Sequence, residues 1–365
     1  MYTRRGTGSR TSSLGLSGGH DSNLLREAAA WRLSTRQREL PCATSHSTPE
    51  FVSEPAVAQS LMEHPKNPLL KLMKQITDRS WLFAGRLVLS ETDAPADQHS
   101  WSDGKGVYYT ITDASRAPPS TQDLPADGDV QLVYDAGGVS AVWAIGNAYC
   151  KIKILEPHTT REHVTLEYLQ TRAPLSFAIP RVIYQTEFDS LYCIVLSKVE
   201  GVILDEAWDE MDERMKEQCV SQVVNICGEL ASWRGESVSG VDGNYLSELY
   251  LSGKDGASDP DSLMEVCRAV NMDCTSLVFY HCDLGPGNII VNMREGVVGI
   301  IDWETAGFVP KEWIRTKFRV SSGLNFAGDD QDCAVDWRVR VQRQLGEEGY
   351  KDVADDWTEW FTGKV

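Results

Sequence analysis

Two aspartates and an asparagine in the C-terminal half are placed where they could do chemistry together. Asp283 and Asn288 bracket a Gly-Pro-Gly loop between two apolar runs, and Asp302 follows a third apolar run after a turn at residues 294–296. The pattern predicts strand, tight loop, strand, hairpin turn and strand, so that three oxygen-bearing side chains converge on one spot. Such a spot suits phosphoryl transfer, where catalysis rests on positioning a hydroxyl and neutralising phosphate charge with metal ions.

The spacing His281-x-Asp283-x4-Asn288 suggests a role for each residue. In the kinase catalytic loop, which has this spacing, the Asp accepts or orients the hydroxyl proton of the acceptor, and the Asn and a later Asp hold Mg²⁺. Asp283 is therefore the candidate base, and Asn288 and Asp302 are the candidate metal ligands. Taken alone, an Asp in such a loop is usually a turn former, and it is the joint pattern with Asn288 and Asp302 that favours catalysis by Asp283. His281 is expected to brace the loop by hydrogen bonding rather than to do chemistry.

Two longer segments carry a resemblance to a known family. His-x-Asp-Leu-x-x-x-Asn-Ile at 281–289 and Ile-Asp-Trp-Glu-x-Ala-Gly-x-x-Pro at 301–310 resemble the aminoglycoside phosphotransferase and choline kinase branch of the kinase-like fold, and most of all its fungal members. The resemblance covers about residues 130–320. It implies ATP and Mg²⁺ as cofactors and a hydroxyl of a small molecule as phosphoryl acceptor. A protein kinase is disfavoured by Trp303-Glu304 after the metal Asp and by the lack of an Ala-Pro-Glu segment.

Three strands are predicted at residues 130–134, 141–145 and 148–154, the last two joined by a two-residue turn, Gly146-Asn147. The connection between the first two strands is poor in glycine and on its own could be a simple bend. The resemblance implies that Gly138 and Ser140 lie in a loop that covers the phosphates through its main-chain N–H groups.

The third of these strands carries Lys151 and Lys153 on the face that also holds Tyr149, because side chains alternate along a strand. One lysine should reach the α and β phosphates, and counting from the hairpin turn favours Lys151. Glu162, from the helix expected to begin near residue 160, should pair with it. Two solvated lysines and an acid favoured by the helix dipole remain the alternative.

Two further strands, at residues 179–183 and 191–196, complete the predicted sheet, and the second is apolar throughout, which predicts burial on both faces. The chain then enters a segment at 197–201 that resembles the hinge where adenine binds main-chain groups. Ser197 and Val199 are the candidate positions there.

Helices are predicted at four other places. One begins with Asn67 as cap and Pro68 at its first position and turns a face made of Leu69, Leu72, Met73 and Ile76 inward. The others are a long amphipathic helix at 209–234, a helix from Pro260 capped by Ser258 or Asp259, and a Trp-rich helical region after Pro310 that the resemblance links to the acceptor pocket. Further strands are predicted at 86–90 and 107–112.

These elements predict an α+β protein, and the resemblance implies a bilobal, protein-kinase-like fold: a small lobe built on an antiparallel sheet and a mainly helical large lobe. The predicted boundaries are 1–66 for an N-terminal extension, 67–199 for the small lobe with its preceding helix and strands, and 200–365 for the large lobe with the catalytic loop and acceptor site. The extension is expected to be largely disordered, apart from a short helix within 22–40, and an organelle transit peptide is the alternative.

The composition argues against some classes of binding partner and indicates the cellular compartment. A formal charge of −18 argues against nucleic acid, and the absence of a long apolar run argues against a membrane-spanning chain. The acidity would suit a cationic acceptor, although a solvated acidic surface explains it as well. Nine cysteines, scattered in apolar segments without any C-x-x-C, indicate a reducing compartment rather than a zinc site. We therefore expect a cytoplasmic protein, with a mitochondrial one as the alternative.

The main alternative hypothesis is a pseudokinase that keeps the fold, with or without nucleotide affinity, but serves as a scaffold for a partner. A degenerate site normally loses one of the five key positions, and Lys151, Glu162, Asp283, Asn288 and Asp302 are all present. The identity of the acceptor, the choice between ATP and GTP, and the oligomeric state stay open.

Overall fold

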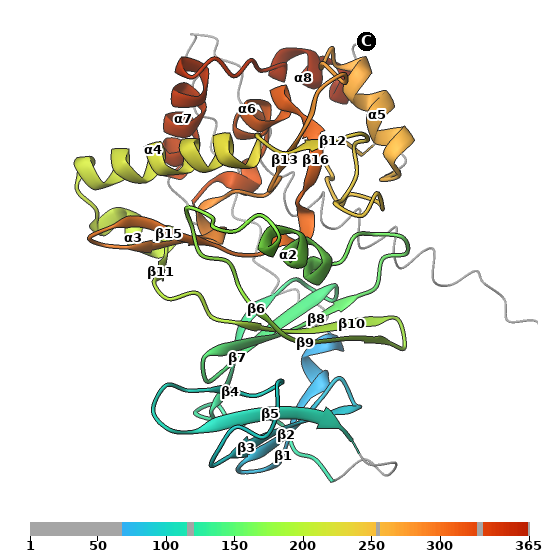
Figure 1. Ribbon diagram of the computed structural model, residues 1–365, viewed down its shortest axis with the longest axis vertical. Helices are drawn as coiled ribbons and strands as arrows, with labels where there is room; N and C mark the ends of the chain where they lie inside the picture. Colours follow the sequence, from blue (N-terminus) through green and yellow to red (C-terminus); the bar gives the residue numbers. More distant parts are fainter. Residues whose placement is uncertain (1–67, 115–119, 253–255, 327–330, 364–365) are drawn as a thin grey trace, which may run out of the picture. The chain divides into compact units, whose positions relative to one another are not determined.

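The computed structural model describes residues 68–114, 120–252, 256–326 and 331–363. All of them belong to one compact unit, Pro41–Val365. Residues 1–66, predicted to be an extension, lie outside the described residues. Within the described part the class is α+β, as predicted: antiparallel sheets come first along the chain and most helices later (Figure 1).

The first sheet lies before the residues expected to form the kinase-like fold, and only part of it was predicted from the sequence. Its five strands run in the order β1-β2-β3-β5-β4. Their bounds are β1 Met73–Thr77, β2 Ser80–Phe83, β3 Leu87–Thr92, β4 Trp101–Ser102 and β5 Tyr108–Asp113. Strands near β3 and β5 were predicted, but β1, β2 and β4 were not.

The helix predicted from Asn67 onward is wrong. Asn67 itself lies outside the described residues, Pro68–Leu72 form a short 3₁₀ helix (η1), and the chain then continues as β1. Met73 and Gln75 are buried while their neighbours are partly exposed, which is the two-residue period of a strand rather than the helical one. Four apolar residues spaced across this boundary mimicked a helical face.

The second sheet carries the predicted lysines, and its strands run in the order β6-β7-β8-β10-β9. Their bounds are β6 Val130–Asp135, β7 Ser140–Ile145, β8 Ala148–Ile154, β9 Val182–Phe188 and β10 Leu191–Ser197. The turn at 146–147 is present as predicted, and the interior of β10 is buried as predicted. One strand was misplaced, since β9 begins at residue 182 rather than 179. Helix α2, Glu162–Gln170, follows β8.

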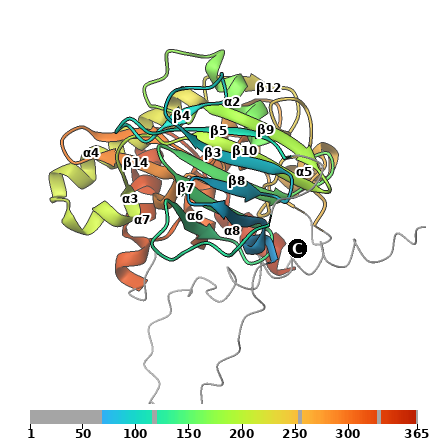
Figure 2. The same ribbon diagram turned by 90° about the horizontal axis from the view of Figure 1, so that it is seen from below.

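The two five-stranded sheets share one apolar core, to which β1–β3 contribute residues such as Trp81, Phe83 and Leu89, and β7 and β8 contribute Trp143 and Cys150. Figure 2 shows the first sheet in front of the second. Alternation along β8 therefore turns Cys150 and Ile152 toward this core and Lys151 and Lys153 toward the opposite face.

The rest of the described chain is mainly helical around a second core that contains two three-stranded sheets, β11-β14-β15 and β12-β13-β16. The strands are β11 Val202–Ile203, β12 Arg234–Gly235, β13 Leu277–Tyr280, β14 Ile289–Asn292, β15 Gly296–Ile300 and β16 Gly307–Pro310. The helices are α3 Leu204–Ala207, α4 Glu213–Leu230, α5 Pro260–Ala269, α6 Lys311–Val320, α7 Gln331–Glu347 and α8 Ala354–Thr362, with short 3₁₀ turns η2 Trp208–Glu210, η3 Pro286–Asn288, η4 Trp303–Thr305 and η5 Ser322–Leu324.

The predicted helix at 209–234 is shorter in the structure. Asp212 caps α4 by accepting a hydrogen bond from the N–H of Met215, and α4 ends at Leu230, so that Arg234 lies in a strand. For α5 the cap is Asp259, one of the two candidates. Trp313, Trp337 and Trp357 are buried in the core, so these three aromatics serve packing first.

Candidate active site

The Lys151 ammonium group lies at the centre of a buried charge cluster. Its Nζ is 3.0 Å from Glu162 Oε2, 2.6 Å from Asp302 Oδ1 and 2.8 Å from Glu304 Oε2. The predicted contact between Lys151 and Glu162 is therefore present. Lys153 contacts only Glu304 in this cluster, at 3.3 Å. Of the two lysines, Lys151 is the one aligned with Glu162, as the count from the hairpin turn predicted.

Backbone geometry brings these groups together from three elements. Lys151 comes from β8, and Glu162 is the first residue of α2. Asp302 follows β15 in a left-handed conformation (φ 63°), which turns the chain sharply into η4 and places Glu304 beside it. The other Glu162 oxygen, Oε1, accepts a hydrogen bond from the N–H of Trp303 at 3.2 Å. Glu162 thus joins β8, α2 and the turn after β15.

Charge and burial oppose each other in this cluster. Burial alone would lower the pKa of Lys151, but Asp302, Glu162 and Glu304 together raise it well above its ordinary value. Burial raises the pKa of Glu162, Lys151 opposes that shift, and the neighbouring carboxylates reinforce it. Two ammonium groups face three carboxylates, so the cluster has room for more positive charge.

A divalent cation fits these donors. Oxygen atoms of Glu162, Asp302 and Glu304 all lie within 4.8 Å of one another, and carboxylate oxygens are the ligands that Mg²⁺ prefers. Asn288 lies next to them because its main-chain oxygen accepts a hydrogen bond from the N–H of Ile301 at 3.0 Å. The predicted ligands Asn288 and Asp302 are therefore neighbours, and Glu304 is a third candidate that the sequence reading left out.

The catalytic-loop candidates are held by a compact set of hydrogen bonds. Asn288 Nδ2 donates to the main-chain oxygen of Asp283 at 2.7 Å and to its Oδ2 at 3.2 Å. The Nδ1 atom of His281 accepts from the N–H of Asp283 at 3.2 Å, and its Nε2 lies 3.0 Å from the main-chain oxygen of Ile301. This pattern requires the Nε2–H tautomer. Burial lowers the pKa of His281, which favours the neutral ring. His281 thus braces the loop, as predicted.

The predicted phosphate loop lies at the Lys153 end of β8. Ser140 pairs with Lys153 in the register of β7 and β8. Gly137 and Gly138 have φ values of 62° and 102°, conformations that favour glycine and let the chain turn between β6 and β7. Ser140 therefore lies opposite Lys153 at the edge of the cluster, while Gly138 lies in the turn before β7, where a Cβ would meet Pro68.

The predicted hinge follows β10 directly. The Ser197 N–H and hydroxyl are both engaged with the main chain of Arg181, and the Lys198 N–H donates to Asn147. Among the main-chain hydrogen bonds of the described residues, none involves Val199. Tyr149, which precedes Lys151 by two residues, lies on the site face, and the Lys198 ammonium group is 5.3 Å from its ring centre. Of the two candidate positions, Val199 keeps its main-chain groups available.

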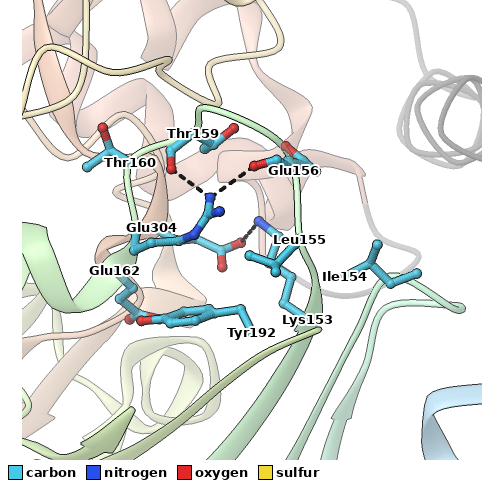
Figure 3. Close-up of a pocket in the computed structure, with 10 residues that line it drawn as sticks. Lys153, Ile154, Leu155, Glu156, Thr159, Thr160, Glu162, Tyr192 and Glu304 are labelled. Carbon is cyan, nitrogen blue, oxygen red and sulfur yellow. Dashed lines mark hydrogen bonds and ion pairs between the residues drawn. The ribbon is translucent and has the colours of Figure 1, made fainter. Parts of the chain in front are cut away.

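A small polar pocket adjoins the cluster between the end of β8 and the start of α2 (Figure 3). Glu304 and Lys153 form one wall, and Tyr192 from β10 forms another. Arg161 is fixed there by its hydrogen bonds to the main-chain oxygens of Glu156 and Thr159, at 2.9 and 2.6 Å. The full lining is Lys153, Ile154, Leu155, Glu156, Thr159, Thr160, Arg161, Glu162, Tyr192 and Glu304.

Two residues of the site were missed as functional candidates. Glu304 was noted only as part of a Trp-Glu pair typical of the family, and it reaches the cluster because of the left-handed turn at Asp302. Tyr149 was placed on the correct strand face but received no role. The described cysteines are free, and no described helix is long and apolar enough to cross a membrane.

Comparison with known proteins agrees with the resemblance read from the sequence. Residues 150–310 match the model of the phosphotransferase enzyme family, from β8 through the segment at 197–201 and the loop at 281–288 to β16. None of the curated proteins matches the chain at a significant level.

Solved structures similar to the chain include aminoglycoside phosphotransferases. APH(3'')-Id from Streptomyces rimosus is 16% identical, with 64% of this chain and 91% of that one covered and a TM-score of 0.41. A ternary complex of APH(2'')-IIa with streptomycin and ATP is 15% identical, with 62% and 84% covered and a TM-score of 0.42. A thermostable mutant of APH(4)-Ia is 14% identical, with 63% and 83% covered and a TM-score of 0.43.

Proposed function

We propose that this chain, similar over residues 150–310 to the phosphotransferase enzyme family, transfers the γ-phosphoryl group of ATP to a hydroxyl of a small molecule. The observation that carries the proposal is the meeting of Lys151, Glu162 and Asp302 beside the loop that holds Asp283 and Asn288. These groups come from segments more than 100 residues apart in sequence. Packing alone gives no reason to collect so many charges in a half-buried site.

Each residue has a task in the proposed reaction. Lys151 would bind the α and β phosphates, and Glu162 would hold the ammonium group in place. Asp283 would orient the acceptor hydroxyl and take its proton, since a general base must lie within hydrogen-bond reach of that proton. Val199 would offer main-chain groups to the base of the nucleotide, and Tyr149 an aromatic surface. The loop with Gly138 and Ser140 would cover the phosphates with N–H groups.

Asn288, Asp302 and Glu304 are the residues that would hold Mg²⁺. A bound Mg²⁺ neutralises phosphate charge and orients the transferred group. The residues of the chain would contribute oxygen ligands at fixed positions, because η4 and the loop after β13 are tied together through Asn288 and Ile301. Lys151 forms ion pairs with Asp302 and Glu304. We infer that, on nucleotide binding, the phosphates would replace these carboxylates as partners of Lys151, and a cation would replace Lys151 as the partner of the carboxylates.

Nucleotide binding can be tested without knowing the acceptor. Thermal melting should show a larger stabilisation by ATP with Mg²⁺ than by ATP alone, since a ligand bound to the native state stabilises by RT ln(1 + [L]/Kd). In Asp302→Asn this difference should shrink. Equal shifts with and without Mg²⁺ in the wild type would count against the proposed metal site.

Transfer itself requires an acceptor screen. Wild-type protein is incubated with ATP and Mg²⁺ over panels of amino alcohols, sugars, aminoglycosides and other hydroxyl compounds, and product masses are recorded for one added phosphate. A product formed by the wild type and not by Asp283→Asn would support the reaction. ATP binding with no product in a broad panel would favour the scaffold function instead.

A further inference from the structure

The first sheet, β1 to β5, contacts the turn between β7 and β8 with its own edge. On β4, Trp101 Nε1 donates a buried hydrogen bond to the main-chain oxygen of Ile145 at 2.9 Å. The next residue, Ser102, accepts a hydrogen bond from the N–H of Asn147 at 3.0 Å. One strand of the added sheet thus binds the turn on both sides of Gly146.

Aromatic packing closes this contact. Tyr109 of β5 stacks on Trp101, with ring centres 5.7 Å apart and an angle of 24° between the rings. Gly146 lies against the Tyr109 ring so closely that a Cβ there would be 2.6 Å from a ring carbon. Its φ of 53° also favours glycine. We call Trp101, Ser102 and Tyr109 the turn clamp.

The other side of the same turn holds the hinge. The main-chain oxygen of Asn147 accepts a hydrogen bond from the N–H of Lys198 at 3.0 Å, directly before Val199. Two residues beyond Asn147, Tyr149 lies under the Lys198 ammonium group. The turn therefore connects the clamp on one side with the segment proposed to bind the nucleotide base on the other.

We propose that the first sheet is a positioning element for the nucleotide: the turn clamp fixes Asn147, and Asn147 fixes the hinge at Lys198 and Val199. The inference rests on the proposed function. Base recognition by main-chain groups depends on where the hinge backbone lies, so a displaced turn weakens binding even though no clamp residue touches the nucleotide. The clamp precedes residue 150, where the match to the phosphotransferase family begins.

The test compares a clamp variant with a variant of the same sheet at a residue outside the turn clamp. Trp101→Phe keeps an aromatic ring but removes the Nε1–H donor. Leu89→Ala removes a fully buried side chain from β3, which pairs with β2 and β5 rather than with the turn. Kd for ATP with Mg²⁺ is measured by calorimetry, and thermal melting is recorded for all three proteins.

We expect Trp101→Phe to raise Kd about 3- to 10-fold, and Leu89→Ala to lower the melting temperature at least as much while Kd stays within about twofold. An unchanged Kd in Trp101→Phe, or equal changes of Kd in both variants, would overturn the positioning role. Failure of the wild type to bind ATP would instead overturn the proposed function, and this inference with it.

Hydrogen exchange gives a second readout that needs no nucleotide. Peptides that cover residues 197–201 should exchange faster in Trp101→Phe than in wild type, because the acceptor of the Lys198 N–H is less firmly held. In Leu89→Ala they should exchange at the wild-type rate under conditions where both variants are folded. Equal exchange in the two variants would contradict the connection through Asn147.

Discussion

At the scale of the residue, the candidate site is defined by two lysines and three carboxylates, with Lys151 in contact with all three carboxylates. Lys151 and Lys153 are both buried and lie on one strand face. Their partners differ, since Lys151 forms ion pairs with Glu162, Asp302 and Glu304, while the ion pair of Lys153 among the described residues is with Glu304. Because the two lysines are buried to the same extent but differ in their ion pairs, one can serve as the control for the other.

Replacing Lys151 by Met should reduce phosphoryl transfer far more than the same replacement of Lys153. We expect a loss on the order of 10² to 10³ for Lys151→Met, the usual effect of removing one preorganised electrostatic group, and less than about 10-fold for Lys153→Met. Initial rates of product formation with an acceptor found by screening give the order. The reverse order would move the nucleotide by two positions along β8.

His281 should make stability depend on pH. Burial lowers its folded-state pKa below the ordinary value of 6.5, so the unfolded chain binds the proton more readily. The His281 contribution is therefore complete above about pH 6.5 and is lost as the pH falls toward the folded pKa, with a slope of at most about 1.4 kcal/mol per pH unit.

Urea unfolding of wild type and His281→Asn between pH 7.5 and 5.5 measures this contribution. The wild type should lose more stability than the variant over that interval. His163, whose pKa is also lowered by burial, is present in both proteins, so the difference isolates His281. Parallel curves would show that His281 does not titrate in this range.

At the scale of the element, the site depends on how closely the segment before β9 and the segment after β10 approach β15. Gly299 lies between Val199 of the hinge and Ala178, which precedes β9. Its position on β15 is fixed by hydrogen bonds from the Ala178 N–H to Val298 and from the Ile300 N–H to Ala178, at 2.9 and 3.0 Å. A Cβ at Gly299 would collide with Val199 Cγ1 and lie 3.2 Å from the Ala178 oxygen.

Gly299→Ala should therefore destabilise the fold by about 1–3 kcal/mol, the usual cost of overpacking. Gly287→Ala is the matched control, because a Cβ there meets no atom within 4 Å, and its free energy of unfolding should change much less. Both values come from urea unfolding. A Gly299→Ala protein as stable as the control would mean that the hinge and β15 can separate freely.

Helices and strands were predictable from the sequence where the apolar residues followed a single spacing, either that of a helix or that of a strand. Strand β8 was predicted with its bounds, and the Pro260 helix with its start and two candidate caps, because turn and capping residues mark their ends. The segment around Met73 was wrongly predicted to be a helix, because a 3₁₀ turn followed directly by a strand places apolar residues at nearly helical intervals. The pairing of Lys151 with Glu162 followed from spacing, but the approach of Glu304 required the left-handed turn at Asp302, which no residue type announces.

At the scale of the whole molecule, the match to the phosphotransferase family begins at residue 150 and leaves the first sheet outside it. The chain nevertheless builds one continuous core from both five-stranded sheets. The sequence predicted β3 and β5 but not their sheet, because β2 and β4 are only four and two residues long and the residues of β1 were assigned to a helix. The missing strands pair with their neighbours along the chain, β2 with β1 and β3 and β4 with β5.

The last prediction separates an enzyme from a scaffold. Asp283→Asn is nearly isosteric and can keep the hydrogen bond to Asn288 through its side-chain oxygen, while it removes the proposed base and one negative charge near the phosphates. Affinity for ATP should hold or rise slightly, and phosphoryl transfer should fall by about 10² to 10⁴-fold, the usual contribution of a positioned general base.

The two effects are measured on both proteins, ATP affinity by calorimetry in the presence of Mg²⁺ and phosphoryl transfer by product formation. A scaffold has no turnover to lose, so its partner binding should ignore the change, and product formation that survives in Asp283→Asn would remove this residue from the mechanism.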